Sequence, residues 1–396
     1  MPHVLLHRRQ ANNSGVRSGF SKQMTTRSNS ALLASSAALL FFLVGCSTAM
    51  NTPPIQAKEP HALQHILFVG DSFTHGRYLP VRTYNNTAVT GGIGSTVAST
   101  SVVDENFDTA VTARQESSAG ETGPWGGIPG IFAEFASEAG FPYDVHIEAI
   151  SATSLAKNYS AASDVITRPN WDTVVLQEAT FQPIPSSISL DSNSNPASFC
   201  TAVNTIEAAV HTTAPNARIF LYETGAPADT AYRLSTAAAP FSDSAYLLSL
   251  ETLTSAYHDA YVSAASQNQR IAGIAPTGDA WSLAWSLGVA NPDPYGGNAS
   301  GVSLTFNYQS GSSPSTRNTP TDAGFHHPSI YGAYLNALVL FQRISDTDVR
   351  TLGGAEQAAA FLGIAPEVAV DLQKVAWIAV TLEGSTLPPA NYNPCH

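Results

Sequence analysis

The sequence is poor in charged residues, which make up 12% of its 396 positions, and it has only three cysteines. Its 18 Lys and Arg are outnumbered by 30 Asp and Glu, which gives a formal net charge of −12. A surface with this balance repels the phosphates of nucleic acid, so we predict no nucleic-acid partner. Paired Cys and His spacings typical of zinc sites are missing as well, and we predict no metal there.

Common nucleotide-binding motifs are also missing. The glycine-rich segment 85–130 contains neither G-x-x-x-x-G-K-[ST] nor G-x-G-x-x-G between a strand and a helix, so we interpret it as long loops. Around Ser72, Thr74 occupies the position at which a G-x-S-x-G nucleophile elbow requires its second glycine. This argues against an α/β-hydrolase of the usual type.

Residues 1–45 have the pattern of a targeting segment. Their five basic residues precede an apolar run from Ala31 to Val44, and the segment contains no acid. The run leads to Leu43-Val44-Gly45-Cys46, which resembles a bacterial lipobox and predicts lipidation of Cys46. A plain signal peptide with an incidental cysteine is the alternative, and a start at Met24 would give a signal of ordinary length. Without residues 1–45 the chain keeps 13 basic and 30 acidic residues, a formal charge of −17.

The remaining chain is predicted to be one domain. We expect a tether over 46–62, a catalytic domain over 63–384 and a Pro-rich tail over 385–396. Short apolar strands near 66–69, 145–150, 172–176, 218–222 and 271–275 are separated by helical segments, which predicts an α/β fold with a mainly parallel five-stranded sheet. Cys200 and Cys395 would pair in an oxidising periplasm or remain as two thiols, and the sequence leaves both possibilities open.

The first strand ends in Gly70-Asp71-Ser72, and a second polar group precedes a late helix. A serine at the carboxyl edge of a parallel sheet lies where such sheets bind ligands, although a helix N-cap is an equally simple interpretation. His326-His327-Pro328-Ser329 stands before a predicted helix over 330–344. Histidine is the usual base for a serine nucleophile. A metal site on the two adjacent histidines is disfavoured, because their side chains point in different directions.

The Gly-Asp-Ser-Phe sequence and the His-Pro-Ser sequence resemble the first and last motifs of the SGNH (GDSL-like) hydrolase family, in a divergent bacterial branch. The resemblance covers residues 65–345. It implies a flavodoxin-like three-layer α/β/α sandwich with long loop insertions, Ser72 as nucleophile and no cofactor or metal. The base is then His327, with His326 as the alternative. In the family pattern Asp-x-x-His the acid stands three residues before the histidine, and that position here is Gly324. Asp322 stands two residues earlier and is the candidate acid despite this difference in spacing. An acid from another part of the chain is the alternative.

The same resemblance implies three donors to an oxyanion. They are the backbone N–H of Ser72, an N–H after the second predicted strand and an amide after the third. Ala152 stands where the family has a glycine, and its N–H can serve provided that its φ is not positive. Gln177 stands where the family has asparagine, and it serves as a donor or merely bonds backbone at the strand end.

The function predicted from these residues is a serine esterase of the bacterial cell envelope, anchored through lipid on Cys46. Family substrates include acetylated sugars, lipids and thioesters, and long polar loops with tryptophans favour O-acetyl groups on carbohydrate. The alternative is an inactive surface lipoprotein of the same fold that binds glycan. A phosphodiester-acting enzyme is a weaker third hypothesis. The distance from Ser72 Oγ to the nearer of His326 and His327 distinguishes the esterase from the glycan-binding protein. A distance of more than about 6 Å would favour glycan binding without catalysis.

Overall fold

The computed structural model describes residues 61–87, 101–116, 123–294, 302–307, 324–382 and 392–395. These lie within one compact unit that runs from Glu59 to His396. The predicted targeting segment, Cys46 and Asp322 all lie outside the described residues, so their roles stay predictions. None of the helices described is both long enough and apolar enough to cross a membrane.

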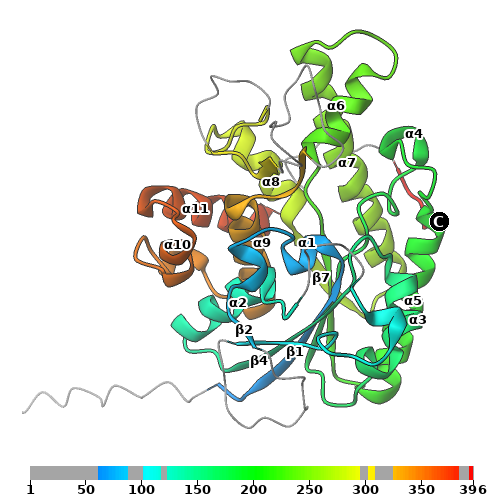
Figure 1. Cartoon of the computed structure of the whole chain (residues 1–396), viewed down its shortest axis with the longest axis vertical. Coiled ribbons are helices and arrows are strands. Elements are labelled where there is room, and N and C mark those ends of the chain that lie inside the picture. Colours follow the sequence, from blue (N-terminus) through cyan, green and yellow to red (C-terminus); the bar gives the residue numbers. More distant parts are fainter. Residues whose placement is uncertain are drawn as a thin grey trace, which may run out of the picture. The chain divides into compact units, whose positions relative to one another are not determined.

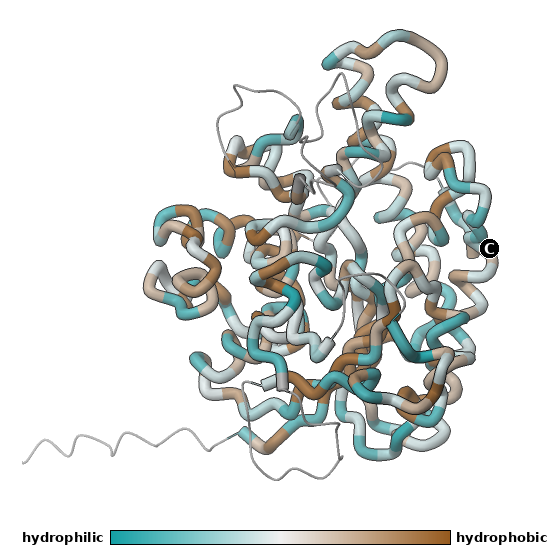
Figure 2. Tube along the Cα trace, in the orientation of Figure 1, coloured by the Kyte–Doolittle hydropathy of each residue, from teal (hydrophilic) through white to brown (hydrophobic). Residues whose placement is uncertain are grey.

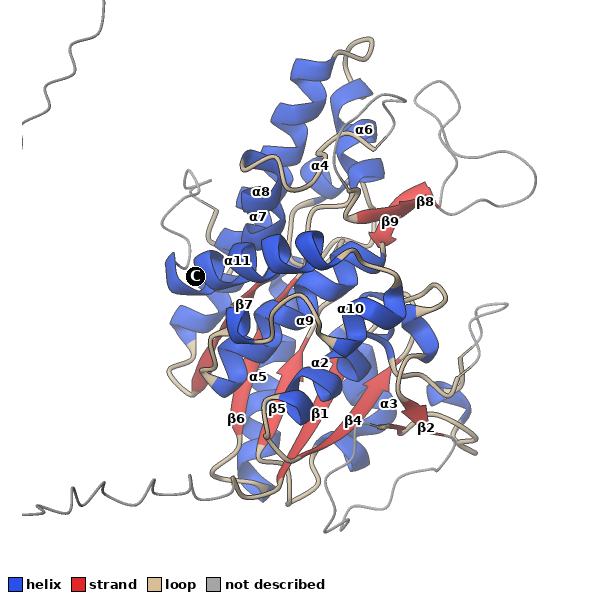
Figure 3. Cartoon of the chain, turned by 90° about the vertical axis from the view of Figure 1, so that its left-hand side faces the viewer, coloured by secondary structure: helices blue, strands red, loops and turns tan. Residues whose placement is uncertain are grey.

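One parallel sheet forms the centre of this unit, with strand order β2-β3-β4-β1-β5-β6-β7 (Figure 3). Its strands are β1 (Gln64–Gly70), β2 (Asn86–Thr87), β3 (Val102–Asp104), β4 (Tyr143–Ala149), β5 (Thr173–Leu176), β6 (Arg218–Glu223) and β7 (Ile271–Pro276). The prediction of a parallel α/β sheet is confirmed, but the number of five strands is wrong. Strands β2 and β3 have only two and three residues, too few to show a periodic pattern in a loop-like segment.

Helices cover both faces of the sheet, which confirms the three-layer arrangement (Figure 1). On one face lie α2 (Gly127–Glu138), α8 (Thr277–Ser286), α9 (Ile330–Ser345), α10 (Gln357–Leu362) and α11 (Pro366–Leu382). On the other lie α3 (Leu155–Ile166), α5 (Pro196–Thr213) and part of α7 (Asp243–Gln267). In β1, Ile66 and Phe68 belong to the first layer, whereas Leu67 and Val69 belong to the second. Burial on both faces explains the unbroken apolar run of β1 and the hydrophobic colour of the central strands in Figure 2.

Several smaller elements complete the described part of the fold. They are α1 (Ser72–His75), α4 (Ser186–Ser189), α6 (Ala228–Thr236), the antiparallel pair β8 (Thr305–Asn307) and β9 (Gly324–Pro328), and 3-10 turns at Val81–Thr83, Thr112–Arg114 and Val349–Thr351. Helices α6 and α8 were not predicted from the sequence. Helix α6 packs with α7 around Tyr246 and Tyr257 in a third apolar cluster that also includes Phe325 of β9. The segment that carries His326 and His327 is therefore held by a core of its own.

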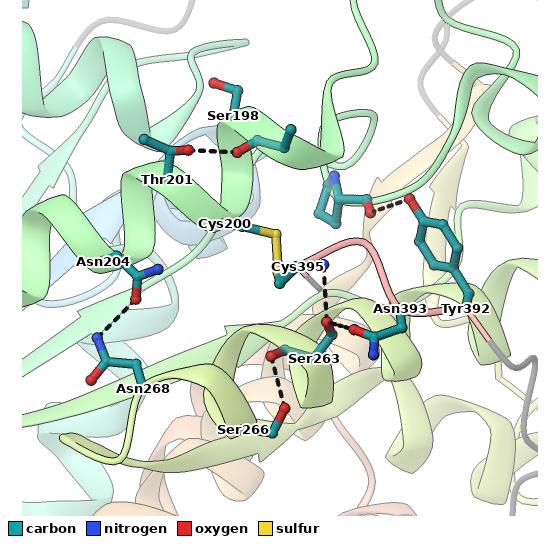
Figure 4. Close-up of a disulfide and its surroundings, with 12 residues drawn as sticks. Ser198, Cys200, Thr201, Asn204, Ser263, Ser266, Asn268, Tyr392, Asn393 and Cys395 are labelled. Atoms are coloured by element: carbon teal, nitrogen blue, oxygen red, sulfur yellow. Dashed lines mark hydrogen bonds between the residues drawn. A yellow bond between two sulfur atoms is a disulfide. The ribbon is translucent and has the colours of Figure 1, made fainter.

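A disulfide joins Cys200 of α5 to Cys395 across 195 residues of sequence (Figure 4). Near the same end, Tyr392 N–H donates to Asp259 Oδ2 at 2.8 Å. The pairing that the sequence left open is thus formed, and it fastens the end of the chain to α5 and α7.

Replacing Cys200 by serine is expected to lower the free energy of unfolding by about 2–5 kcal/mol, because a long loop in the unfolded chain is no longer closed. Urea denaturation of the wild type, of Cys200→Ser and of Cys395→Ser checks this. The two variants should match each other and the reduced wild type, since each loses the same bond. A wild type that titrates with two free thiols before reduction would contradict the pairing.

Candidate active site

Ser72 is held at the carboxyl end of β1 by its neighbours in the chain. Asp71 caps the short helix α1, and its Oδ1 accepts a hydrogen bond from the N–H of Phe73 at 2.9 Å. The capping role suggested for this pair of residues therefore belongs to Asp71, and the Ser72 hydroxyl is left for other contacts. Gly70 is required before the turn, because a Cβ there would lie 2.2 Å from Thr74 Oγ1.

His327 lies beside Ser72 although 255 residues separate them in sequence. The Ser72 Oγ to His327 Nε2 distance is 2.8 Å, and both residues are buried. His327 is in β9, and Ser329 two residues later caps α9 through its Oγ, which accepts from the N–H groups of Tyr331 and Gly332 at 3.1 and 3.3 Å. The His-Pro-Ser sequence thus places the imidazole at a fixed strand-to-helix junction. This arrangement is that of a hydroxyl paired with its base.

Burial holds the pKa of His327 well below its usual range, with further contributions from His326 and Arg77. The imidazole is therefore neutral near pH 7 and can accept the Ser72 proton at Nε2, provided that Nδ1 carries the ring hydrogen. In the part of the chain that the structure describes, Nδ1 has no hydrogen-bond partner. An acid at this atom would orient the ring. Asp322 remains our candidate for that acid, because nothing in the described residues fills the position.

His326, the alternative base, is engaged elsewhere. Its Nδ1 lies 2.8 Å from Asp229 Oδ1 of α6, and its side chain is 23% exposed. The rings of His326 and His327 meet edge to face, with centroids 5.0 Å apart, and Phe73 packs against both. Asp229 was not among the residues singled out from the sequence, and because it stands 97 positions before His326, no local motif indicates the pairing. These contacts favour His327 as the base.

Two backbone N–H groups remain candidates for an oxyanion hole. Within the described residues, neither Ser72 N–H nor Ala152 N–H donates to a protein acceptor. Ala152 has a φ of +54°, so the condition placed on its role, a φ that is not positive, is not met. The positive φ costs conformational strain, but it leaves the backbone N–H in place as a donor. This left-handed conformation strains an alanine by about 1 kcal/mol and suits a glycine, which is the residue of the family pattern at this point.

Gln177 does not have the contacts predicted for an oxyanion donor. Its Oε1 accepts hydrogen bonds from the N–H of Asp71 at 2.9 Å and from Thr74 Oγ1 at 2.7 Å. A backbone N–H can only donate, so the oxygen of the amide must face the turn. Its Nε2 donates to the Glu178 carbonyl at 2.6 Å. Gln177 therefore positions the turn that carries Ser72, and the prediction of an oxyanion role is corrected to a supporting one.

Two more buried residues support the site and were missed in the sequence. Glu178 Oε1 accepts from the N–H groups of Leu155 and Ala179 at 3.0 and 2.8 Å, which fixes the start of α3 behind Ala152. Asn158 Nδ2 donates to the carbonyl of Gly70 at 2.6 Å. Both side chains are buried, and their partners lie far away in sequence or on the backbone, so residue type alone gave no indication of these hydrogen bonds.

Glu178 makes stability depend on pH. Burial raises its pKa to about 8 from an ordinary 4.5, so the folded protein keeps a proton that the unfolded chain loses between these values. The free energy of unfolding attributable to Glu178 therefore falls as pH rises through this window, by up to about 1.4 kcal/mol per pH unit. Glu178→Gln keeps an acceptor and cannot ionise, so its urea stability should decline less between pH 5 and 8. Equal slopes for wild type and variant would contradict the assignment.

A cavity of about 240 Å³ lies next to the loop that carries Ala152. Its lining includes Asp104, Asn106, Asp108, Glu116 and Phe107. None of the described lining residues is Lys or Arg, although Arg114 donates to Asn106 Oδ1 at 2.9 Å. Glu116 Oε2 accepts from the N–H of Ser151 at 3.0 Å, which links the cavity to the residue before Ala152. Asp104 already accepts from the N–H groups of Asn106 and Trp125, so Asp108 is the acid of the lining that is best placed to meet a ligand.

Comparisons with known proteins give similarity of structure only. No family model and no curated protein matches the sequence. The chain is similar to a DUF4886 family protein from Bacteroides uniformis, with 11% identity, a TM-score of 0.44 and coverage of 83% of this chain and 98% of that one. It is similar to a protein from Parabacteroides merdae described as a GDSL-like lipase (12%, TM-score 0.41, 72% and 98%). It is also similar to an acetylxylan esterase from Geobacillus stearothermophilus (12%, TM-score 0.35, 72% and 94%).

Proposed function

We propose that the protein is a serine esterase in which Ser72 attacks the carbonyl of an ester and His327 takes the proton of the hydroxyl. The contact between Ser72 Oγ and His327 Nε2, at 2.8 Å, carries the proposal. Transfer of the proton from Oγ to Nε2 accompanies formation of the bond from Oγ to the carbonyl carbon. The protonated imidazole then gives the proton to the leaving alcohol, which leaves an acyl group on Ser72. Water attacks this acyl-enzyme while His327 takes its proton, and the proton returns to Ser72 Oγ as the acid is released.

The backbone N–H groups of Ser72 and Ala152 are proposed to hold the oxyanion of the tetrahedral intermediate. Removing one such donor costs about 10²–10³ in rate in enzymes of this kind, so even two N–H groups supply much of the stabilisation. Asp322 is proposed to orient the His327 imidazole at Nδ1. The reaction needs no cofactor, because nucleophile, base and donors all come from the chain.

We propose O-acetyl groups on carbohydrate as the substrate, with the protein tethered to the cell envelope through lipid on Cys46. The cavity linked to Ser151 supports a neutral, hydroxyl-rich alcohol, because acid and amide side chains such as Asp108 and Gln115 line it and their oxygens can accept hydrogen bonds from hydroxyls. The same carboxylates disfavour a phosphorylated or otherwise anionic substrate. Glycan binding without catalysis, the alternative function, is less well supported now that Ser72 and His327 are in contact.

Three acetate esters that differ only in their alcohol test the substrate class. We expect turnover of acetylated xylo-oligosaccharide and of p-nitrophenyl acetate, with little turnover of an acetylated sugar phosphate. Asp108→Asn should lower kcat/KM for the oligosaccharide while leaving that for p-nitrophenyl acetate unchanged. If the oligosaccharide binds without being hydrolysed by a folded wild type, the glycan-binding function replaces the esterase.

A further inference from the structure

A second cluster of reactive side chains lies at the carboxyl ends of β6 and β7. Glu223 is the last residue of β6, Asp279 stands in the first turn of α8, just after β7, and His258 comes from α7. Ligand atoms from the three residues all lie within 4.8 Å of one another. No other group of three such residues in the described ranges meets this condition.

The distances suit a single bound cation. His258 Nδ1 lies 3.2 Å from Asp279 Oδ2 and 4.0 Å from Glu223 Oε2. A dication bound at about 2.1 Å by nitrogen and oxygen ligands keeps neighbouring ligand atoms about 3.4 Å apart in tetrahedral geometry. Small side-chain shifts would therefore bring all three ligands to bonding distance.

The two carboxylates are deeply buried and lie against the same backbone. Glu223 is fully buried and Asp279 is 3% exposed. A Cβ on Gly278 would be 2.3 Å from Glu223 Oε1, which shows that this carboxylate rests on the start of α8 next to Asp279. The N-terminus of α8 stabilises negative charge at Asp279 in part, and a bound cation would stabilise the buried carboxylates further.

Asp279 gives the independent observation that points to a ligand. In the described residues neither of its carboxylate oxygens accepts a hydrogen bond, and its charged neighbour is the His258 ring. Buried carboxylates nearly always accept several hydrogen bonds or coordinate a cation. A cation between Asp279 and His258 would use the lone pairs of the Asp279 carboxylate, which accept no hydrogen bond in the described residues.

We propose that Glu223, His258 and Asp279 bind one divalent transition-metal ion such as Zn²⁺. A set of two carboxylates and one imidazole suits Zn²⁺ or Mn²⁺ better than Mg²⁺ or Ca²⁺, which prefer oxygen alone. The His258 side chain is 16% exposed, so water can complete the coordination on that side. The ion joins the end of β6 to α7 and α8, and its role is to stabilise these elements rather than to take part in ester cleavage.

Calorimetric titration of the EDTA-treated, untagged protein with ZnCl₂ tests the proposal, with CaCl₂ as the comparison. We expect one equivalent of Zn²⁺ to bind and the Tm to rise by several degrees. Affinity should fall on the order of 100-fold in Asp279→Asn and in His258→Gln. Glu251→Gln, which removes an exposed acid from α7, is the matched control and should bind like the wild type.

Three results would overturn the metal site. They are a wild type without saturable Zn²⁺ binding, variants that bind as tightly as the wild type, or Ca²⁺ binding as tight as Zn²⁺. If Asp279→Asn fails to fold, as judged by circular dichroism, His258→Gln decides alone, because its side chain is partly exposed. The outcome is independent of the esterase proposal, since binding and Tm are measured without substrate.

Discussion

Ser72→Ala is expected to lower kcat/KM for p-nitrophenyl acetate by about 10³-fold or more, which is about 4 kcal/mol of transition-state stabilisation. The variant removes the oxygen that would form the acyl-enzyme and leaves the backbone N–H in place. Initial rates at substrate concentrations far below KM measure the effect. The packing around Ser72 loses one buried hydroxyl only, so the Tm should change little.

Ser163→Ala is the matched control for this experiment, because Ser163 is exposed on α3 and contacts neither Ser72 nor His327 through its side chain. Its kinetics should equal those of the wild type. If Ser72→Ala also retains wild-type kcat/KM, the serine mechanism is excluded.

His327→Ala is expected to cause a loss of similar size, about 10³-fold in kcat/KM, whereas His326→Ala should cost far less. The reason is the hydrogen bond from the Ser72 hydroxyl to His327 Nε2, in contrast to the pairing of His326 with Asp229. Loss of His326 still removes a ring that packs against His327, so an effect of about tenfold is expected from altered positioning. The reverse order of the two losses would assign the base to His326.

The pH profile of kcat/KM gives a second check on His327. Its lowered pKa means that the imidazole stays neutral, and therefore able to accept a proton, as pH falls through 6.5. Activity of the free enzyme should persist at pH 5.5 and decline only at lower pH. The prediction assumes that burial outweighs the carboxylate proposed at Nδ1, because a carboxylate alone would raise the pKa of the ring. A descending limb centred near pH 6.5 or above would contradict that balance.

The sequence predicted the parts of this fold that depend on local patterns. Apolar runs such as Ile66 to Val69 marked the five long strands, and Gly-Asp-Ser with His-Pro-Ser marked the two ends of the site. Strands β2 and β3 were missed because pairing with a neighbour, rather than their own composition, makes two or three residues extended.

Partners that come together only through the tertiary fold could not be predicted. Asp229 meets His326 because α6 packs over β9, and Gln177 was assigned from its position after β5 without knowledge of which amide atom faces Asp71. The positive φ of Ala152 likewise depends on the loop between β4 and α3 and not on the alanine. Glu223, His258 and Asp279 have no motif spacing, so the cluster that they form was not visible in the sequence.

The most direct test of the central claim is covalent labelling of the wild type with a fluorophosphonate, followed by intact mass and peptide mapping. We expect one adduct per chain, on Ser72, that forms slowly or not at all in His327→Ala and is absent in Ser72→Ala. A wild type that is folded but gains no adduct, or an adduct on another serine, would contradict Ser72 as the nucleophile.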